Sequence, residues 1–239
     1  MGAGMQPPAV SQTQSEGSSF ADVFKVLYEP TAVFERVRVG PSFFAPFLAI
    51  VVAQCVLFFV NLPFMKVAIQ AQMAARGAAG GATPPVGVFA GIGLVILVIV
   101  LGIVLVLSAL ILWALVSVFG GEAQFSRLLS VAAFSAIPAA ILLTAVGSLV
   151  LHLQGPTGLT SPQDMQPALG LDLLAPGVKG FVGGVLKGIN PFSIWSLVLT
   201  AIGVSTTQRL SKSTGYTVAA IQFAITLLIA GAFASLGGR

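Results

Sequence analysis

Long apolar runs alternate with short polar connections along most of the chain. Each run is close to the roughly 20 residues that a helix needs to cross the hydrocarbon of a bilayer. The runs are continuously apolar and lack the alternating polarity of a transmembrane β-barrel strand. They therefore predict five membrane-spanning helices, over about 43–65, 88–118, 128–151, 191–208 and 216–236.

Two of these runs have unusual lengths. Taken at its outer limits, Val86 to Phe119, the second run would be about 51 Å long as a helix. We read it as one tilted or protruding helix, because it is too short for two spans and a turn. The fourth run is the shortest, and the topology changes parity if it only re-enters the membrane.

Composition supports a membrane protein. Hydrophobic residues make up 56 % of the chain and charged residues 8 %, against about 25 % charged in an ordinary soluble domain. The 11 Lys and Arg and the 7 Asp and Glu all lie outside the five runs, as expected from the cost of burying charge in lipid. The cations are scattered, which excludes a nucleic-acid-binding patch. The predicted fold class is therefore all-α, a polytopic membrane helix bundle.

The region before the first span divides into two parts. Residues 1–19 are rich in Gly, Pro, Ser and Gln and predict a disordered tail. Residues 20–40 predict amphipathic juxtamembrane helices, with Ser19 and Asp22 as a capping pair and Pro30 opening the second helix. This arm either docks a partner, lies on the bilayer, or packs beneath its own bundle. Its apolar positions are Phe20, Val23, Phe24 and Leu27, then Val33, Phe34 and Val37.

The longest connection, 152–190, is expected to be an external loop. Its second half, 177–189, mixes apolar residues with Lys179 and Lys187, a pattern typical of a helix in the membrane interface or of a re-entrant helix. Glycines four residues apart allow another helix to approach closely, or alternatively make the segment a poor helix. These glycines are Gly180, Gly184 and Gly188.

Orientation depends on the cations. The two sides of the predicted topology receive nearly equal numbers of Lys and Arg, and the connection Arg209–Gly215 is the best cytoplasmic loop. We therefore expect a cytoplasmic N-terminus and an external C-terminus. Richness in Ala, Gly and Val suggests a bacterial source, and the expected location is then a bacterial inner membrane.

Little catalytic chemistry is available. A single cysteine, Cys55, and a single histidine, His152, exclude a disulfide within the chain and leave no Cys/His metal cage. The carboxylates form no acid–base pair, and neither a nucleophile elbow nor a phosphate loop is present. We predict no catalytic residue, no cofactor and no metal ligand.

Polar and small residues within the spans have two interpretations. Gln54, Asn61 and Gln222 either bond across helices, at about 0.6 kcal/mol each, or line a path for a neutral solute. Gly87 and Gly91 form a GxxxG pair that permits close helix packing, in the bundle or between copies.

Four segments of the sequence resemble the Yip-domain family. They are Leu27–Pro30, Gly121–Phe125, Phe134–Pro138, and Asn190–Trp195 followed by Gly203. The resemblance implies a five-span bundle with a cytoplasmic N-terminus. Eukaryotic members bind Rab-type GTPases, and bacterial members lack that machinery. The residues with a structural or partner-binding role would be Leu27, Tyr28, Pro30, Gly121, Phe125, Ser135, Pro138, Asn190, Pro191, Phe192, Trp195 and Gly203.

Two functions follow as expectations. The first is a non-enzymatic scaffold or assembly partner in contact with the bilayer, with other membrane proteins and with further copies of itself. The alternative is a permease or channel for a neutral or apolar solute. An intramembrane enzyme is the third class, and it would need a cofactor that the sequence does not reveal.

Overall fold

The computed structural model describes residues 20–75 and 86–237, and these residues contain helices and connections but no strand. The all-α prediction is confirmed. The predicted tail, 1–19, lies outside the described residues. The helices are α1 (Phe20–Lys25), α2 (Pro30–Val39), α3 (Phe44–Ala75), α4 (Val86–Val118), α5 (Phe125–Ile137), α6 (Thr144–Gln154), α7 (Gly180–Gly188), α8 (Pro191–Thr207) and α9 (Lys212–Gly237), with a π-helix η1 (Pro138–Leu143) and short 3-10 turns η2 (Pro162–Met165) and η3 (Leu171–Leu174).

Four stretches among the described residues are long and apolar enough to span a membrane. A fifth exists if α7 and α8, which meet at 64°, count as one span. The second predicted span is a single helix, α4, of 33 residues. The four stretches are Phe44–Ala75, Gly91–Val118, Phe125–Gln154 and Lys212–Leu236.

The bent pair α7–α8 packs along successive parts of α9. A Cβ on Gly184 would lie 2.8 Å from the carbonyl oxygen of Ala230, and one on Gly188 would collide with Leu227. Near the other end of α9, a Cβ on Gly215 would lie 2.7 Å from the carbonyl oxygen of Ala201 in α8. The residues 180–188 thus form a helix, in which Gly184 and Gly188 allow close contact with α9.

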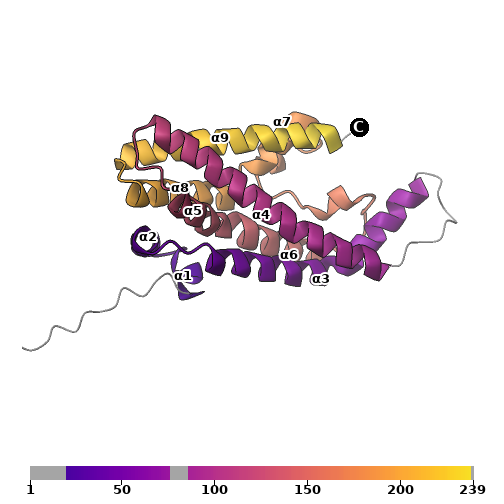
Figure 1. Cartoon of the computed structure of the whole chain (residues 1–239). Helices are drawn as coiled ribbons and strands as arrows, with labels where there is room; N and C mark the ends of the chain where they lie inside the picture. The colour runs from indigo at the N-terminus through magenta and orange to yellow at the C-terminus, as the bar shows by residue number, and fades with distance from the viewer. Residues whose placement is uncertain (1–19, 76–85, 238–239) are drawn as a thin grey trace, which may run out of the picture.

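Helix α2 lies across one end of the bundle, where it is seen end-on, and the C-terminus lies at the opposite end (Figure 1). Its apolar stripe, Val33, Phe34 and Val37, is fully buried against α5 and α8. The rings of Phe34 and Phe134 meet edge to face with centroids 6.4 Å apart. The arm therefore packs against its own bundle by this stripe.

Helix α1 and the turn after it bury only part of the predicted apolar face, which comprised Phe20, Val23, Phe24 and Leu27. Val23 and Val26 are buried, whereas Phe20 and Phe24 are exposed. The rotation of α1 is fixed by the Asp22 carboxylate, which is paired with the guanidinium of Arg36 in α2. The predicted capping role of Asp22 concerns Ser19, which lies outside the described residues.

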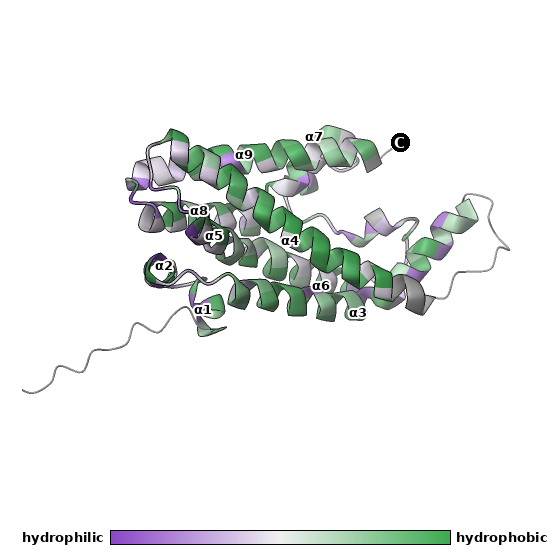
Figure 2. Cartoon of the chain, in the orientation of Figure 1, coloured by the Kyte–Doolittle hydropathy of each residue, from purple (hydrophilic) through white to green (hydrophobic). Residues whose placement is uncertain are grey.

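The outer helices present apolar side chains to the surroundings. Helix α4 crosses the bundle diagonally and is green along nearly its whole length in Figure 2. Only its inner positions are buried, among them Ala109, Leu112 and Val116. The last turns of α3 bend away from the bundle (Figure 1), and this helix contains an internal proline, Pro63.

The third predicted span is interrupted by a π-helix that begins at Pro138. A serine one turn earlier, Ser135, does not satisfy the backbone group that this proline frees. The buried Ser135 hydroxyl has no hydrogen-bond partner among the described residues. The carbonyl of Ala140 instead accepts from Thr144 Oγ1, at 2.7 Å, and from the side-chain amide of Gln54.

Candidate functional site

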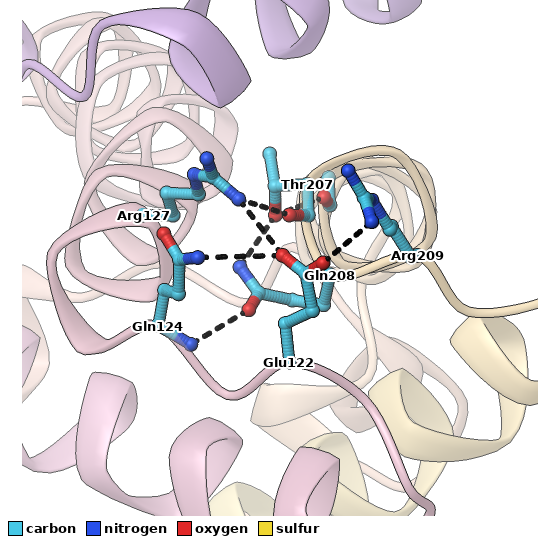
Figure 3. Close-up of polar contacts among 7 residues, drawn as sticks. Glu122, Gln124, Arg127, Thr207, Gln208 and Arg209 are labelled. Carbon is cyan, nitrogen blue, oxygen red and sulfur yellow. Dashed lines mark hydrogen bonds and ion pairs between the residues drawn. The ribbon is translucent and has the colours of Figure 1, made fainter.

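A cluster of polar side chains joins two turns at the end of the bundle that carries α2. It comprises six residues, drawn in Figure 3, and we refer to it as the Glu122 cluster. One turn connects α4 to α5 and the other connects α8 to α9. The members are Glu122, Gln124 and Arg127 from the first turn and the start of α5, and Thr207, Gln208 and Arg209 from the second.

The Glu122 carboxylate is the charged centre of this cluster. Its Oε2 accepts from Arg127 Nη1 at 3.2 Å and from Gln124 Nε2 at 3.3 Å. Its Oε1 lies 3.0 Å from Nη1 of Arg209. Arg127 Nη1 also contacts the carbonyl oxygen of Thr207 at 3.3 Å, so the ion pair extends from one turn to the other.

Gln208 forms the uncharged half of the cluster and is completely buried. Its Oε1 accepts from the backbone N–H of Gln124 at 2.9 Å, and its Nε2 donates to Thr207 Oγ1 at 2.9 Å. Its carbonyl accepts from the Glu122 N–H at 3.2 Å. A buried amide with its donor and acceptor both used contributes to specificity without an unpaired polar group.

Both turns contain a non-glycine residue in the left-handed region. These are Ala123, with φ of 45°, and Arg209, with φ of 55°. Such a conformation costs on the order of 1–3 kcal/mol and persists where surrounding contacts fix it. Here the contacts are those of Glu122 and Gln208, which hold the two turns together.

The chemistry of the Glu122 cluster is that of a structural ion pair. Both oxygens of the carboxylate are held by arginines, and neither faces a second acid. In residues 20–75 and 86–237, no group of three or more His, Cys, Asp or Glu side chains could hold a metal ion.

A second polar contact lies within the spans, between α3 and α6. Gln54 Nε2 donates to Thr144 Oγ1 at 3.2 Å, and Ser148 Oγ donates to Asn61 Oδ1 at 2.8 Å. His152 follows on the same face of α6, where its Nδ1–H donates to the Ser148 carbonyl at 2.8 Å. We call this row of contacts the α3–α6 seam.

The third polar residue predicted at depth, Gln222, bonds between helices. Its Nε2 donates to Ser108 Oγ, at 2.6 Å, and so links α9 to α4. All three predicted polar residues, Gln54, Asn61 and Gln222, therefore bond across helices in the structure.

The residues of the four family-like segments do not converge on one site. Pro30, Gly121, Phe125 and Gly203 lie toward the end that carries α2. A Cβ on Gly203 would lie 2.7 Å from Val131 Cγ1 and 3.0 Å from the Phe34 ring. Glycine at this position allows α2, α5 and α8 to meet.

The remaining segment, Asn190–Trp195, forms the joint between α7 and α8. Asn190 Oδ1 accepts from the Ser193 N–H at 2.9 Å, and Ser193 Oγ accepts from the Asn190 N–H at 3.0 Å. Asn190 Nδ2 donates to the carbonyl of Lys187 at 3.1 Å. This capping box, with Pro191 at the first helical position, satisfies backbone groups at the bend, which lipid cannot do.

Five other predicted residues have simpler surroundings. Leu27 packs on the core, Tyr28 and Trp195 are exposed, and Phe192 is half-buried. A Cβ on Gly91 would meet open space, so this half of the GxxxG pair makes no close packing with the residues that the structure describes. The side-chain surroundings of Gly87 fall outside the described residues.

The Glu122 cluster was not predicted from the sequence. A signal was present, because the two turns were predicted on the same side of the membrane and carry Glu122, Arg127 and Arg209. Opposite charges beside span ends on one side are candidates for an ion pair. The buried amide of Gln208 had no such signal.

The fold and these sites define an all-α polytopic membrane protein whose polar groups bond helices and turns to one another. The family model described as the Yip1 domain matches residues 24–234. The chain belongs to the Yip1 domain family, so the family predicted from the sequence is confirmed. It is 28 % identical over 238 residues to a membrane protein of Bacillus subtilis (strain 168), YknW, with 96 % of this chain and 98 % of that protein covered. No solved structure matches the chain.

Proposed function

We propose that this protein is a non-enzymatic scaffold or assembly partner of other membrane proteins, placed in a bacterial inner membrane with its N-terminus in the cytoplasm. The observation that carries the proposal is the fixed position of α2 across the end of the bundle. Its inner stripe is locked between α5 and α8, while Thr31, Glu35 and Arg38 are exposed at a spacing of one helix face. A rigid polar helix face at a membrane surface suits recognition of another protein.

The contacts of the charged side chains support the same proposal. Among the residues that the structure describes, the charged side chains that form ion pairs bond to one another, as in Asp22–Arg36 and Glu122–Arg127. Enzymes and ion carriers in membranes generally place ionisable groups at depth. Here the contacts at depth are between amides and hydroxyls.

A test of the scaffold has to leave the core of the bundle intact. Deleting residues 20–39 would remove Phe34 from the core, so loss of a partner would not be informative. We would instead introduce a photo-crosslinking amino acid at Thr31 or Glu35 in cells, with Val95 on the exposed face of α4 as the matched control. The expected result is a defined protein adduct from α2 and none of the same size from α4.

Charge reversal makes this test specific. Arg38→Glu should reduce the α2 adduct, while the unfolding temperature of the purified protein stays unchanged. Identical adducts from α2 and α4, or an adduct insensitive to Arg38→Glu, would count against the scaffold.

The α3–α6 seam supports the second candidate, a permease for a neutral solute. Its amides and hydroxyls could exchange their contacts with a solute that carries similar groups. Liposomes that contain the protein should then pass small neutral solutes down a gradient, and Gln54→Leu should reduce the flux. If liposomes with the protein and empty liposomes show the same flux, the permease is contradicted and the scaffold proposal is unaffected.

A further inference from the structure

One face of α1 is not covered by any other residue that the structure describes. The side chains of Phe20, Phe24 and Tyr28 are 56 %, 70 % and 66 % exposed. They are spaced four residues apart, which places them on one side of a helical turn. Hydrogen bonds from Leu27 N–H and Tyr28 N–H to the carbonyls of Phe24 and Lys25 continue that turn beyond α1. The opposite side, with Val23 and Val26, is buried.

The position of α1 indicates what lies against this face. Helix α1 packs on α2 and α3 and lies on the flank of the bundle, at the level where α3 begins (Figure 1). The first residue of α3, Phe44, is itself exposed, as are Val52 and Val56 further along the same helix. The bilayer surrounds α3, so the flank beside its first turn lies at the boundary between lipid and water. Aromatic rings favour that boundary.

The orientation of the aromatic face is fixed before any lipid is bound. The bond between Asp22 and Arg36, together with the burial of Val23, prevents α1 from rotating. Little conformational entropy is then lost when the rings enter an interface. The Asp22 hydrogen bond also raises the pKa of the Arg36 guanidinium above its ordinary value, so this guanidinium stays charged at any pH that cells reach.

The charge of the arm favours the apolar part of the interface over charged headgroups. Between residues 20 and 39, three cations are balanced by three carboxylates: Lys25, Arg36 and Arg38 against Asp22, Glu29 and Glu35. An arm that recognised anionic lipids would carry an excess of Lys and Arg. The aromatic rings are the part of this arm that can hold it on a bilayer.

We propose that α1 is an interfacial anchor. The rings of Phe20, Phe24 and Tyr28 insert among the headgroups and upper acyl chains of the bilayer beside the entry of α3. This inference goes beyond the scaffold, because it assigns the uncovered face of α1 to lipid and leaves the outer face of α2 for a partner.

Site-directed spin labelling tests the anchor. In a Cys55→Ser background, a nitroxide is attached at Phe24→Cys, and matched labels are attached at Glu35→Cys on α2 and Val52→Cys on α3. The full chain is reconstituted in vesicles of phosphatidylcholine and phosphatidylglycerol, and collisions with oxygen and with a water-soluble nickel complex are measured. The expected result is that label 24 resembles label 52, with oxygen favoured over nickel several-fold, and that label 35 shows the reverse.

Two outcomes would overturn the proposal. Nickel access at position 24 equal to that at position 35 would place the face in water. Shielding from both reagents would mean that protein covers the face, either a second copy or another part of the chain. Vesicles of phosphatidylcholine alone carry no net charge, and the oxygen preference at position 24 should persist in them. Loss of that preference would show that the anchor needs anionic lipid, which would contradict the proposal. A Phe20→Cys label repeats the measurement should Phe24→Cys perturb the fold.

Discussion

Helices α4 and α5 are both apolar enough to lie in a membrane, yet they differ in what surrounds them. In an apolar 18-residue stretch of α4, 11 % of the residues are buried within the protein. In the corresponding stretch of Phe125–Gln154, which contains α5 and α6, 44 % are buried. Helix α4 is the more apolar of the two, and it contacts lipid. Helix α5 is richer in small and polar residues and forms the centre, where Ser130, Ala133 and Ser135 are buried. In a bilayer, small residues mark the protein interior, because lipid already solvates large aliphatic side chains.

The largest expected effect comes from emptying the centre. Phe34→Ala removes a ring that is buried between α2, α5 and α8, and should lower the free energy of unfolding by about 3–5 kcal/mol. The matched control is Phe24→Ala on the exposed face of α1, which should cost about 1 kcal/mol or less. Denaturant titration in mixed micelles measures both. Equal losses would mean that α2 is not part of the core.

The same substitution, glycine to alanine, should lower the stability of the protein in the buried centre and raise it in the outer helix α4. Gly203→Ala would force a methyl group to within 2.7 Å of Val131, and overpacking of this kind costs about 1–3 kcal/mol. Gly102→Ala in α4 meets open space and should gain up to about 1 kcal/mol from helix propensity. Unfolding of the two variants under the same conditions tests this. Destabilisation by Gly102→Ala would show that α4 is covered by protein instead of lipid.

The position of the long apolar helices could be predicted from the sequence, because the bilayer imposes length and composition on each one separately. The sequence did not reveal which surroundings, lipid or protein, cover each face of a helix. The stripe of Val33, Phe34 and Val37 was visible, but the sequence left open whether lipid, a partner or the bundle would bury it. The rotation of α1 depends on Asp22 and Arg36, which only the fold brings together.

The candidate sites were predictable to different degrees for the same reason. Asn190 and Pro191 act locally, so their place at a helix start was evident, whereas the 64° bend also depends on packing against α9. The Glu122 cluster joins residues such as Gln124 and Gln208, which are 84 apart in the chain. No single member of the cluster is recognisable in the sequence, because the contacts exist only when the fold brings the two turns together.

The Glu122 cluster lies at the bundle end that carries α2, so its charges should contribute less than the buried centre. A double-mutant cycle with Glu122→Gln and Arg127→Gln should give a coupling of about 1 kcal/mol, and one with Arg209→Gln only a few tenths. The reason is exposure, since the Arg209 side chain is 77 % exposed and that of Arg127 is 21 % exposed. Thermal unfolding in detergent at low and high salt measures both couplings. A larger coupling at Arg209 would contradict the geometry.

The smallest effect belongs to the connection after α6, where an exposed turn lies beside α3. Asp164 Oδ2 accepts from Thr160 Oγ1 at 2.7 Å and from the N–H of Thr160 and Ser161 at 2.9 and 2.8 Å. These bonds, that of the Thr160 hydroxyl above all, lower the pKa of Asp164 below its ordinary value of 3.8.

A lowered pKa means that the folded turn prefers the carboxylate. Its contribution is therefore complete above the ordinary pKa of about 3.8 and is lost as the pH falls through the lowered value. The carboxyl carbon of Asp164, followed by NMR, should titrate below 3.8, and Thr160→Val should raise the midpoint part of the way back, because the backbone donors remain. A midpoint unchanged by Thr160→Val would show that the hydroxyl does not hold the carboxylate. At neutral pH, Thr160→Val should leave the global unfolding temperature nearly unchanged, because these bonds lie within one exposed turn, whereas α5 lies at the centre of the bundle.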